Sequence, residues 1–316
     1  MNTNYALIGA AGYIAPRHLK AMRETQGNLL LAHDIHDSVG ILDRYFPKSD
    51  FFNDFSSFEN ALNKINKSQE PCDYVSICSP NYLHYAHIAA TLLAGSHAIC
   101  EKPLVLHPEE LDQLQKLEAE TGKKVFTILQ LRLHPAIIKL KEKVATGPKD
   151  KIYDINLSYI TSRGKWYLRS WKGVEEKSGG IASNIGIHFY DMLMFIFGKL
   201  TKVYMHYKSD LSAAGYLEFE RARVRWMLSI DAQHLPKGIA EKQTTYRSIT
   251  IDGEEIEFSH GFTDLHTSSY QDILQNGGFG IEHSRPSIAL TDMIGKADIE
   301  LDKGEHHPLA LKSVLS

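Results

Sequence analysis

The sequence is poor in cysteine, and its thiols form no redox or metal-binding pattern. Cys72, Cys78 and Cys100 are its three cysteines, without a C-x-x-C pair. An odd, scattered set argues against a disulfide framework or a zinc site. The 16 histidines are dispersed and no H-E-x-x-H occurs, so the sequence predicts no metal. We expect buried, reduced thiols and a cytoplasmic location.

The chain also lacks a charge excess and a long hydrophobic run. Its net charge of −3 creates no field that attracts nucleic acid or an anionic membrane. No apolar run reaches the roughly 18 residues that cross a bilayer. The first ten residues lack the pattern of a secretory signal and are typical of a strand. We expect no nucleic-acid partner and no membrane; 316 residues suffice for one large or two ordinary domains.

The dinucleotide-binding fingerprint G-x-G-x-x-G is missing. An apolar run over 5–10 breaks at Gly9, and Gly12 and Ala15 follow at spacings of three. Small residues allow a backbone to approach a pyrophosphate, and a helix N-terminus favours its charge. By itself this pattern fits an ordinary strand-to-helix turn equally well. As a cofactor turn, it predicts close approach at Gly12, with the backbone of Tyr13 and Ile14 along the pyrophosphate.

The first 131 residues alternate buried strands with helices. Continuous apolar runs without polar alternation predict strands buried on both faces, at 5–10, 29–35, 74–80, 97–103 and 125–131. Helical periods lie between them, at 15–25, 82–94 and 108–121. This alternation predicts an α/β fold with a Rossmann-type, doubly wound parallel sheet, as a domain over 1–131.

The pattern changes after residue 131. Period-two alternation predicts antiparallel strands with one solvated face, at 151–164, 202–210, 215–231 and 246–259, with a hairpin turn at Asp252–Gly253. Helices are expected at 181–198, 266–275 and 285–297. We therefore expect a C-terminal α+β domain over 132–316 with a large, open, mostly antiparallel sheet. Its C-terminal helix is free, in this interpretation, to pack back on the first domain.

Polar residues gather where the predicted parallel strands end, the edge at which such sheets bind ligands. Asp34, after the second strand, can accept hydrogen bonds from ribose hydroxyls and would repel a 2′-phosphate, which favours NAD over NADP; a turn or cap role is the alternative. Lys102 is costly at a buried strand end unless it faces a cleft. The other candidates for cofactor contact at these ends are Ser79, Asn81, His84, Glu101 and Gln130.

Three stretches together resemble the Gfo/Idh/MocA oxidoreductase family over about residues 5–298. They are the E-K-P at 101–103, the wider segment 79–104, and "GGIASNIGIHFYDML" at 179–193. The resemblance implies an NAD(P)-binding Rossmann domain joined to a C-terminal α/β domain with an open sheet. Segments 158–173, 184–193 and 246–258 further resemble the WlbA/WbpB group, which are UDP-N-acetyl-2-amino-2-deoxyglucuronate 3-dehydrogenases of bacterial O-antigen (lipopolysaccharide) biosynthesis.

The predicted catalytic residues are Lys102, Asn184 and His188. Asn184 and His188 are four apart on one helix and share a face. Oxidising a secondary alcohol needs a base and a donor to the developing alkoxide. His188 has a suitable ordinary pKa for the base, with Lys102 as the orienting donor; the reverse assignment stays open. The family commonly has Asp where this chain has Asn184, so no acid is available there.

A segment rich in cations and aromatic rings, 162–173, is the expected substrate contact. Arg163, Trp166, Trp171 and Lys172 suit the diphosphate and carboxylate of a UDP-sugar acid; a solvated edge strand is the alternative. Tyr270 shares a helix face with His266 and is expected either to line the sugar pocket or simply to pack.

The resemblance implies NAD-dependent oxidation of the C3 hydroxyl of UDP-N-acetylglucosaminuronate. The resemblance permits recycling of NADH by 2-oxoglutarate and implies a homo-oligomer, a tetramer. Another sugar or inositol dehydrogenase of the family, and a non-catalytic NAD-binding regulator, remain alternatives.

Overall fold

The computed structural model describes residues 2–239, 241, 243–256 and 264–315. The chain divides into two compact units, one of residues 1–133 with 263–285 and one of 134–262 with 286–316. The sequence-based boundary placed 264–285 in the second domain, and this is corrected here, because the segment belongs to the first unit. Helical periodicity shows that a helix has an apolar face, but it does not show which core that face joins. The end of the predicted strand at 257–259 lies outside the described residues.

The first unit is built on a parallel sheet of six strands in the order β3-β2-β1-β4-β5-β6. All of its pairs are parallel, which confirms the predicted Rossmann-type architecture. The strands are β1 (Asn4–Ile8), β2 (Asn28–His33), β3 (Asp50–Phe52), β4 (Tyr74–Ile77), β5 (His97–Cys100) and β6 (Val125–Thr127). The edge strand β3 was not predicted, because three residues are too few to show a hydrophobic pattern typical of a strand.

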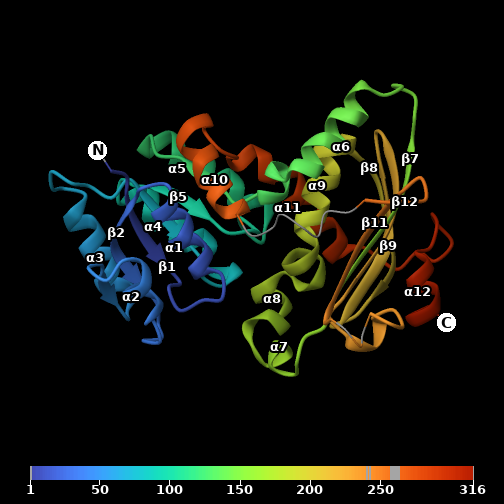
Figure 1. The fold of residues 1–316 in the computed structure, drawn as a ribbon, viewed down its shortest axis with the longest axis horizontal. Coiled ribbons are helices and arrows are strands. Elements are labelled where there is room, and N and C mark those ends of the chain that lie inside the picture. Colours follow the sequence, from blue (N-terminus) through green and yellow to red (C-terminus); the bar gives the residue numbers. More distant parts are fainter. Residues whose placement is uncertain (1, 240, 242, 257–263, 316) are drawn as a thin grey trace. The chain divides into compact units, whose positions relative to one another are not determined.

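Helices cover this sheet, as Figure 1 shows. Pro108 begins the longest of the early helices, and Glu110 accepts from the backbone N–H of His107 in a capping box. One helix, α10, comes from between the two sequence segments of the second unit and buries Tyr270 and Ile273 in the core around Tyr5. The helices of this unit are α1 (Ala15–Glu24), α2 (Ile41–Tyr45), α3 (Phe55–Ile65), α4 (His84–Leu93), α5 (Pro108–Thr121) and α10 (Leu265–Asn276).

The second unit holds a mixed sheet in the order β12-β11-β7-β10-β9-β8. Among the strands that the structure describes, only β7 and β10 pair in parallel, so the sheet is mostly antiparallel, as predicted. Asp252 and Gly253 both adopt positive φ, 52° and 85°, as the predicted two-residue hairpin between β11 and β12 requires. The strands are β7 (Tyr153–Thr161), β8 (Leu200–Lys208), β9 (Ser212–Phe219), β10 (Ala222–Ser229), β11 (Thr245–Ile251) and β12 (Glu254–Glu255).

Helices lie on both faces of this second sheet. On one face α9 packs Tyr190 against Trp226 of β10. On the other, α12 buries Ala310 beside Met227, so the last helix packs on the sheet of its own unit. The helices are α6 (Pro135–Thr146), α7 (Trp166–Arg169), α8 (Glu175–Ser178), α9 (Ile187–Phe197), α11 (Ile281–Lys296), which crosses the division between the units, and α12 (Pro308–Ser313).

One stretch, Glu175–Phe197, is long and apolar enough to cross a membrane by length and composition alone. Its most apolar window is 72% buried inside the protein, as is typical of a core helix.

Candidate active site

The turn after β1 is a tight glycine turn that leads into the N-terminus of α1. Gly9 has φ +89°, and a Cβ added there would lie 2.7 Å from the carbonyl carbon and oxygen of Cys78. The Gly12 N–H donates to the Gly9 carbonyl at 3.0 Å and closes a tight turn into α1. Tyr13 is exposed, and Ile14 precedes the first residue of the helix. The turn therefore requires glycine at position 9 and leads directly into a helix N-terminus.

Asp34 follows β2 and is anchored to this turn. Its Oδ2 accepts from the Ala11 N–H at 2.9 Å, and its Oδ1 accepts from the His36 N–H at 2.9 Å. Each carboxylate oxygen can accept a further hydrogen bond. The turn role and the ribose-binding role predicted for Asp34 are therefore compatible, because one carboxylate can serve both.

The residues after β4 are buried and support the neighbouring strand end. The Ser79 hydroxyl lies 2.8 Å from Nδ1 of His87. The ring nitrogens of His84 lie 2.7 Å from the Pro103 carbonyl and 2.9 Å from that of Ser79. Asn81 is also buried. Because His84 is fully buried and joins the end of β4 to the loop after Lys102, its position favours a supporting role over direct cofactor contact.

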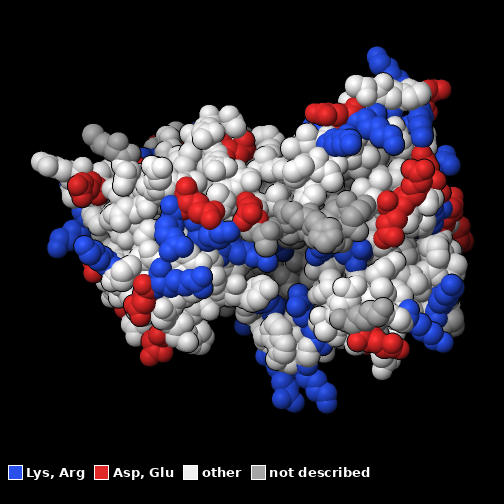
Figure 2. Space-filling view, in the orientation of Figure 1, with Lys and Arg blue, Asp and Glu red and all other residues white. Residues whose placement is uncertain are grey.

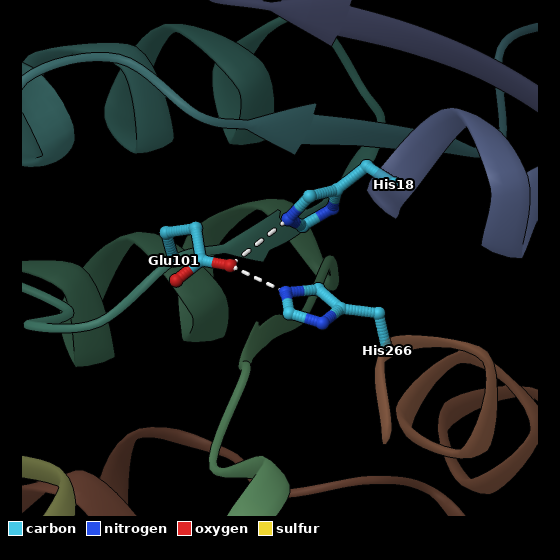
Figure 3. Close-up of side chains that lie close together, drawn as sticks. All are labelled: His18, Glu101 and His266. Carbon is cyan, nitrogen blue, oxygen red and sulfur yellow. Dashed lines mark hydrogen bonds and ion pairs between the residues drawn. The ribbon is translucent and has the colours of Figure 1, made fainter. Parts of the chain in front are cut away.

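Glu101 follows β5 and forms a buried cluster with two histidines, shown in Figure 3. Its Oε1 lies 3.0 Å from Nε2 of His18 and 2.9 Å from Nε2 of His266. Two histidines and a carboxylate also form a set that can hold a metal ion, which the sequence, with its dispersed histidines, did not predict. The N···O distances are those of N–H···O hydrogen bonds.

Gln130 offers an unused acceptor at the end of β6. Its side chain is buried, and among the residues that the structure describes its Oε1 has no hydrogen-bond partner. A buried polar atom without a partner costs roughly 1–3 kcal/mol. This position is therefore suited to a ligand that donates a hydrogen bond.

In the second unit, a π-helical turn at Ala182–Gly186 leads into α9 and carries Asn184. Such turns are rare and often mark functional sites. Asn184 donates from Nδ2 to the phenolic oxygen of buried Tyr167 at 2.5 Å. Burial raises the pKa of Tyr167, so its phenol stays neutral. His188 is half-buried, one turn further along.

The segment 162–173 is largely exposed and carries the predicted substrate contacts. Figure 2 shows Lys and Arg gathered on the part of the second unit that carries α7. Arg163 and Trp166 are exposed, and the Lys172 ammonium lies 4.0 Å from the centre of the Trp171 ring. Lys172 also lines a cavity of about 420 Å³ with Gly179, Gly180 and Lys208.

Tyr270 lies in the core of the first unit. Its side chain is fully buried beside Tyr5, and its hydroxyl lies 2.5 Å from Ser76 Oγ and 2.8 Å from His18 Nδ1. A side chain without exposed surface offers nothing to a sugar, so this position favours the packing alternative. Sequence reasoning missed His18, although it lies on the apolar face of α1 with Leu19 and Met22.

The fold and these strand-end residues define a class: an oxidoreductase with an NAD-binding Rossmann domain and a C-terminal alpha/beta domain. The model of the oxidoreductase family's NAD-binding Rossmann fold matches residues 3–129, and that of its C-terminal alpha/beta domain matches 141–306. The chain belongs to the Gfo/Idh/MocA oxidoreductase family. The predictions of an enzyme of this family and of NAD as its cofactor are confirmed.

Solved structures include a near full-length relative. The WlbA (WbpB) dehydrogenase from Thermus thermophilus, in complex with NAD and alpha-ketoglutarate, is 47% identical, with a TM-score of 0.93 over 97% of this chain and 99% of that one. The same enzyme with NAD and UDP-GlcNAcA is 46% identical, with a TM-score of 0.92 over the same shares.

Curated relatives match over shorter stretches. D-glucoside 3-dehydrogenase of Escherichia coli K12 is 32% identical over 130 residues, which are 40% of this chain and 36% of that protein. The chain spans from about a third to a half of the first two curated relatives it matches, 36% and 52%.

Proposed function

We propose that this chain oxidises the C3 hydroxyl of UDP-N-acetyl-2-amino-2-deoxy-D-glucuronate to the 3-keto sugar, with NAD as oxidant. One observation carries the proposal: identity of 46% over 97% of the chain to an enzyme solved with NAD and UDP-GlcNAcA. The cationic and aromatic segment 162–173 supports it, because a substrate with a diphosphate and a carboxylate needs cations and an uncharged polyol does not.

The first unit fits the cofactor. The tight turn at Gly9 and Gly12 leads into the N-terminus of α1, which suits the charge of a pyrophosphate, and the lone pairs left on Asp34 suit the hydroxyls of the adenosine ribose. Gln130 Oε1 is suited to accept from an amide N–H such as that of the nicotinamide carboxamide. When bound, NAD takes the hydrogen and its bonding electrons from the carbinol carbon.

The remaining steps fall to three side chains. In this proposal His188 takes the hydroxyl proton, Lys102 donates to the oxygen as negative charge develops on it, and Asn184 orients the sugar. The neutral amide of Asn184 cannot act as a general acid, so a mechanism that requires a carboxylic acid at this place is disfavoured. The reverse assignment, with Lys102 as the base and His188 as the donor, is the alternative.

Substrate recognition is proposed for the segment 162–173. The guanidinium of Arg163 and the ammonium of Lys172 suit the phosphate and carboxylate groups, and Trp166 and Trp171 offer flat faces for the base or sugar ring. We further propose that 2-oxoglutarate reoxidises NADH, that the enzyme serves O-antigen biosynthesis in the cytoplasm, and that it assembles as a homotetramer.

The test is turnover of the purified chain with a panel of substrates. UDP-N-acetylglucosaminuronate with NAD should give NADH and a 3-keto product identified by mass spectrometry and NMR. With 2-oxoglutarate present, the amount of 2-hydroxyglutarate formed should equal the amount of 3-keto product. Myo-inositol and UDP-N-acetylglucosamine, which lack the carboxylate, serve as controls. Absence of product from the uronate with either oxidant contradicts the proposal.

A further inference from the structure

A buried carboxylate in the first unit is held by two histidines from distant parts of the chain. Glu101 is only 7% exposed, and His18 and His266 are almost fully buried. His18 comes from α1, the helix after the glycine turn, and His266 comes from α10, which lies in sequence between the two segments of the second unit. Figure 3 shows both rings pointing their Nε2 atoms at one oxygen, Oε1.

The hydrogen positions in this cluster follow from charge. Burial by itself would raise the pKa of Glu101, but the hydrogen bonds from His18 and His266 outweigh it and hold that pKa well below its ordinary value. The carboxylate is therefore ionised, and both Nε2 atoms carry the hydrogens that they donate to it.

A second pair of residues fixes the tautomer of His18. Burial lowers the pKa of His18, so its ring is neutral and its Nδ1 is an acceptor. The Tyr270 hydroxyl, 2.8 Å away, donates to that nitrogen, and Ser76, 2.5 Å further on, donates to Tyr270. The hydrogen bonds therefore run in one direction. Ser76 donates to Tyr270, Tyr270 donates to Nδ1 of His18, and Nε2 of His18 donates to Glu101.

The second carboxylate oxygen is the one left for a ligand. Oε1 already accepts two hydrogen bonds, whereas Oε2 accepts from the Lys102 N–H at 3.3 Å, a long contact. The Glu101 side chain keeps 10% of its surface exposed at the strand end where family members bind NAD.

We propose that His266 and His18 are positioning residues that present Oε2 of Glu101 to a hydroxyl of the nicotinamide ribose. The nucleotide site of the first unit is then completed by α10, a helix that follows residues 134–262 of the second unit in the sequence. The inference rests on NAD binding, which the proposed function includes, but it does not depend on which sugar is oxidised.

The experiment measures NADH affinity by fluorescence titration without any sugar, so failure of the substrate proposal does not affect it. His266→Leu removes the donor and should raise the Kd for NADH about tenfold, as loss of a hydrogen bond to a charged group implies. His266→Gln keeps a side-chain N–H donor and should stay within about threefold of the parent. His206→Leu, which removes a buried histidine of the second unit, is the matched control and should leave the Kd for NADH unchanged.

Tyr270→Phe keeps the buried ring and removes only the hydroxyl, so it tests the proposal if His266→Leu does not fold. It should also weaken NADH binding, by a factor of about three or more. Unchanged affinity in the folded His266→Leu variant, or equal losses in His266→Leu and His266→Gln, would overturn the proposal. So would a stoichiometric transition metal in the purified protein, because His18, Glu101 and His266 would then be its ligands.

Discussion

The amide of Asn184 donates to the phenolic oxygen of Tyr167 at 2.5 Å, and this bond joins the two parts of the second unit to which function is assigned. Tyr167 lies in the cationic, aromatic segment, and Asn184 lies in the π-helical turn before α9. The phenol therefore fixes the orientation of the amide that is proposed to hold the sugar.

Tyr167→Phe removes that acceptor while keeping the buried ring. A hydrogen bond is worth about 1 kcal/mol, so kcat should fall about fivefold, with a smaller change in KM. Tyr153→Phe, a buried tyrosine of β7 that packs on Phe197, is the control and should keep its kcat. Steady-state kinetics on both variants test this expectation. A lower melting temperature with an unchanged kcat in Tyr167→Phe would show that the bond is only structural.

Gly9→Ala should abolish NADH binding, because the new Cβ would lie 2.7 Å from the Cys78 backbone at a φ of +89°. The left-handed backbone costs about 1–2 kcal/mol and the overlap about 1–3 kcal/mol more. Gly122→Ala is a matched control, since Gly122 has φ +70° with nothing within 4 Å of a Cβ. Urea unfolding should show the larger loss of stability in Gly9→Ala; equal losses in the two variants would contradict the steric argument.

Buried His307 makes stability depend on pH. Its Nε2 lies 3.1 Å from Ser158 Oγ, its Nδ1 accepts from the Leu309 N–H, and burial, with a smaller effect of Arg225, lowers its pKa to about 4. The unfolded chain, with a histidine pKa near 6.5, therefore takes up the proton first. The stabilisation is complete above pH 6.5 and is lost as the pH falls toward 4, about 2 kcal/mol by pH 5.

His307→Asn keeps a cap for α12 and removes the titrating group. Urea unfolding at pH 7 and pH 5 should show a drop in the free energy of unfolding that is smaller in the variant by about 2 kcal/mol. Other buried histidines, such as His84 and His87, contribute equally to both proteins. The same pH dependence in the variant and the parent would rule out His307 as a contributor.

Lys102→Ala separates catalysis from cofactor binding. If Lys102 donates to the reacting oxygen, turnover should fall by a factor on the order of 100 or more, while NADH binding and the circular dichroism spectrum persist. Lys151→Ala, which removes a lysine paired with Asp252 in the second unit, is the control. Turnover in Lys102→Ala equal to that of the active parent would refute the assignment. A parent protein that binds NADH but shows no turnover would favour the non-catalytic regulator.

Much of the first unit could be predicted from sequence because its signals are local. Strands buried on both faces leave continuous apolar runs, and the carboxyl ends of parallel strands fall at one edge, which brought Glu101, Lys102 and Gln130 to attention. The turn at Asp252–Gly253 was predictable for the same reason, since two adjacent residues determine it.

The supporting residues could not be predicted, because they depend on pairings distant in sequence. His266 and Tyr270 were seen to share a helix face, but periodicity gives no sign that this face meets His18, about 250 residues earlier in the chain. Likewise, the link between Tyr167 and Asn184 depends on how the chain folds between them. The catalytic and substrate-binding assignments stay predictions.

The central claim is that hydrogen leaves C3 of the uronate for NAD, and isotope transfer tests it most directly. UDP-N-acetylglucosaminuronate carrying deuterium at C3 is incubated with the enzyme and NAD, and the nucleotide is analysed by mass spectrometry. We expect one deuterium in the reduced nucleotide and slower turnover than with the unlabelled sugar. Reduced nucleotide without deuterium would place the oxidation at another carbon and contradict it.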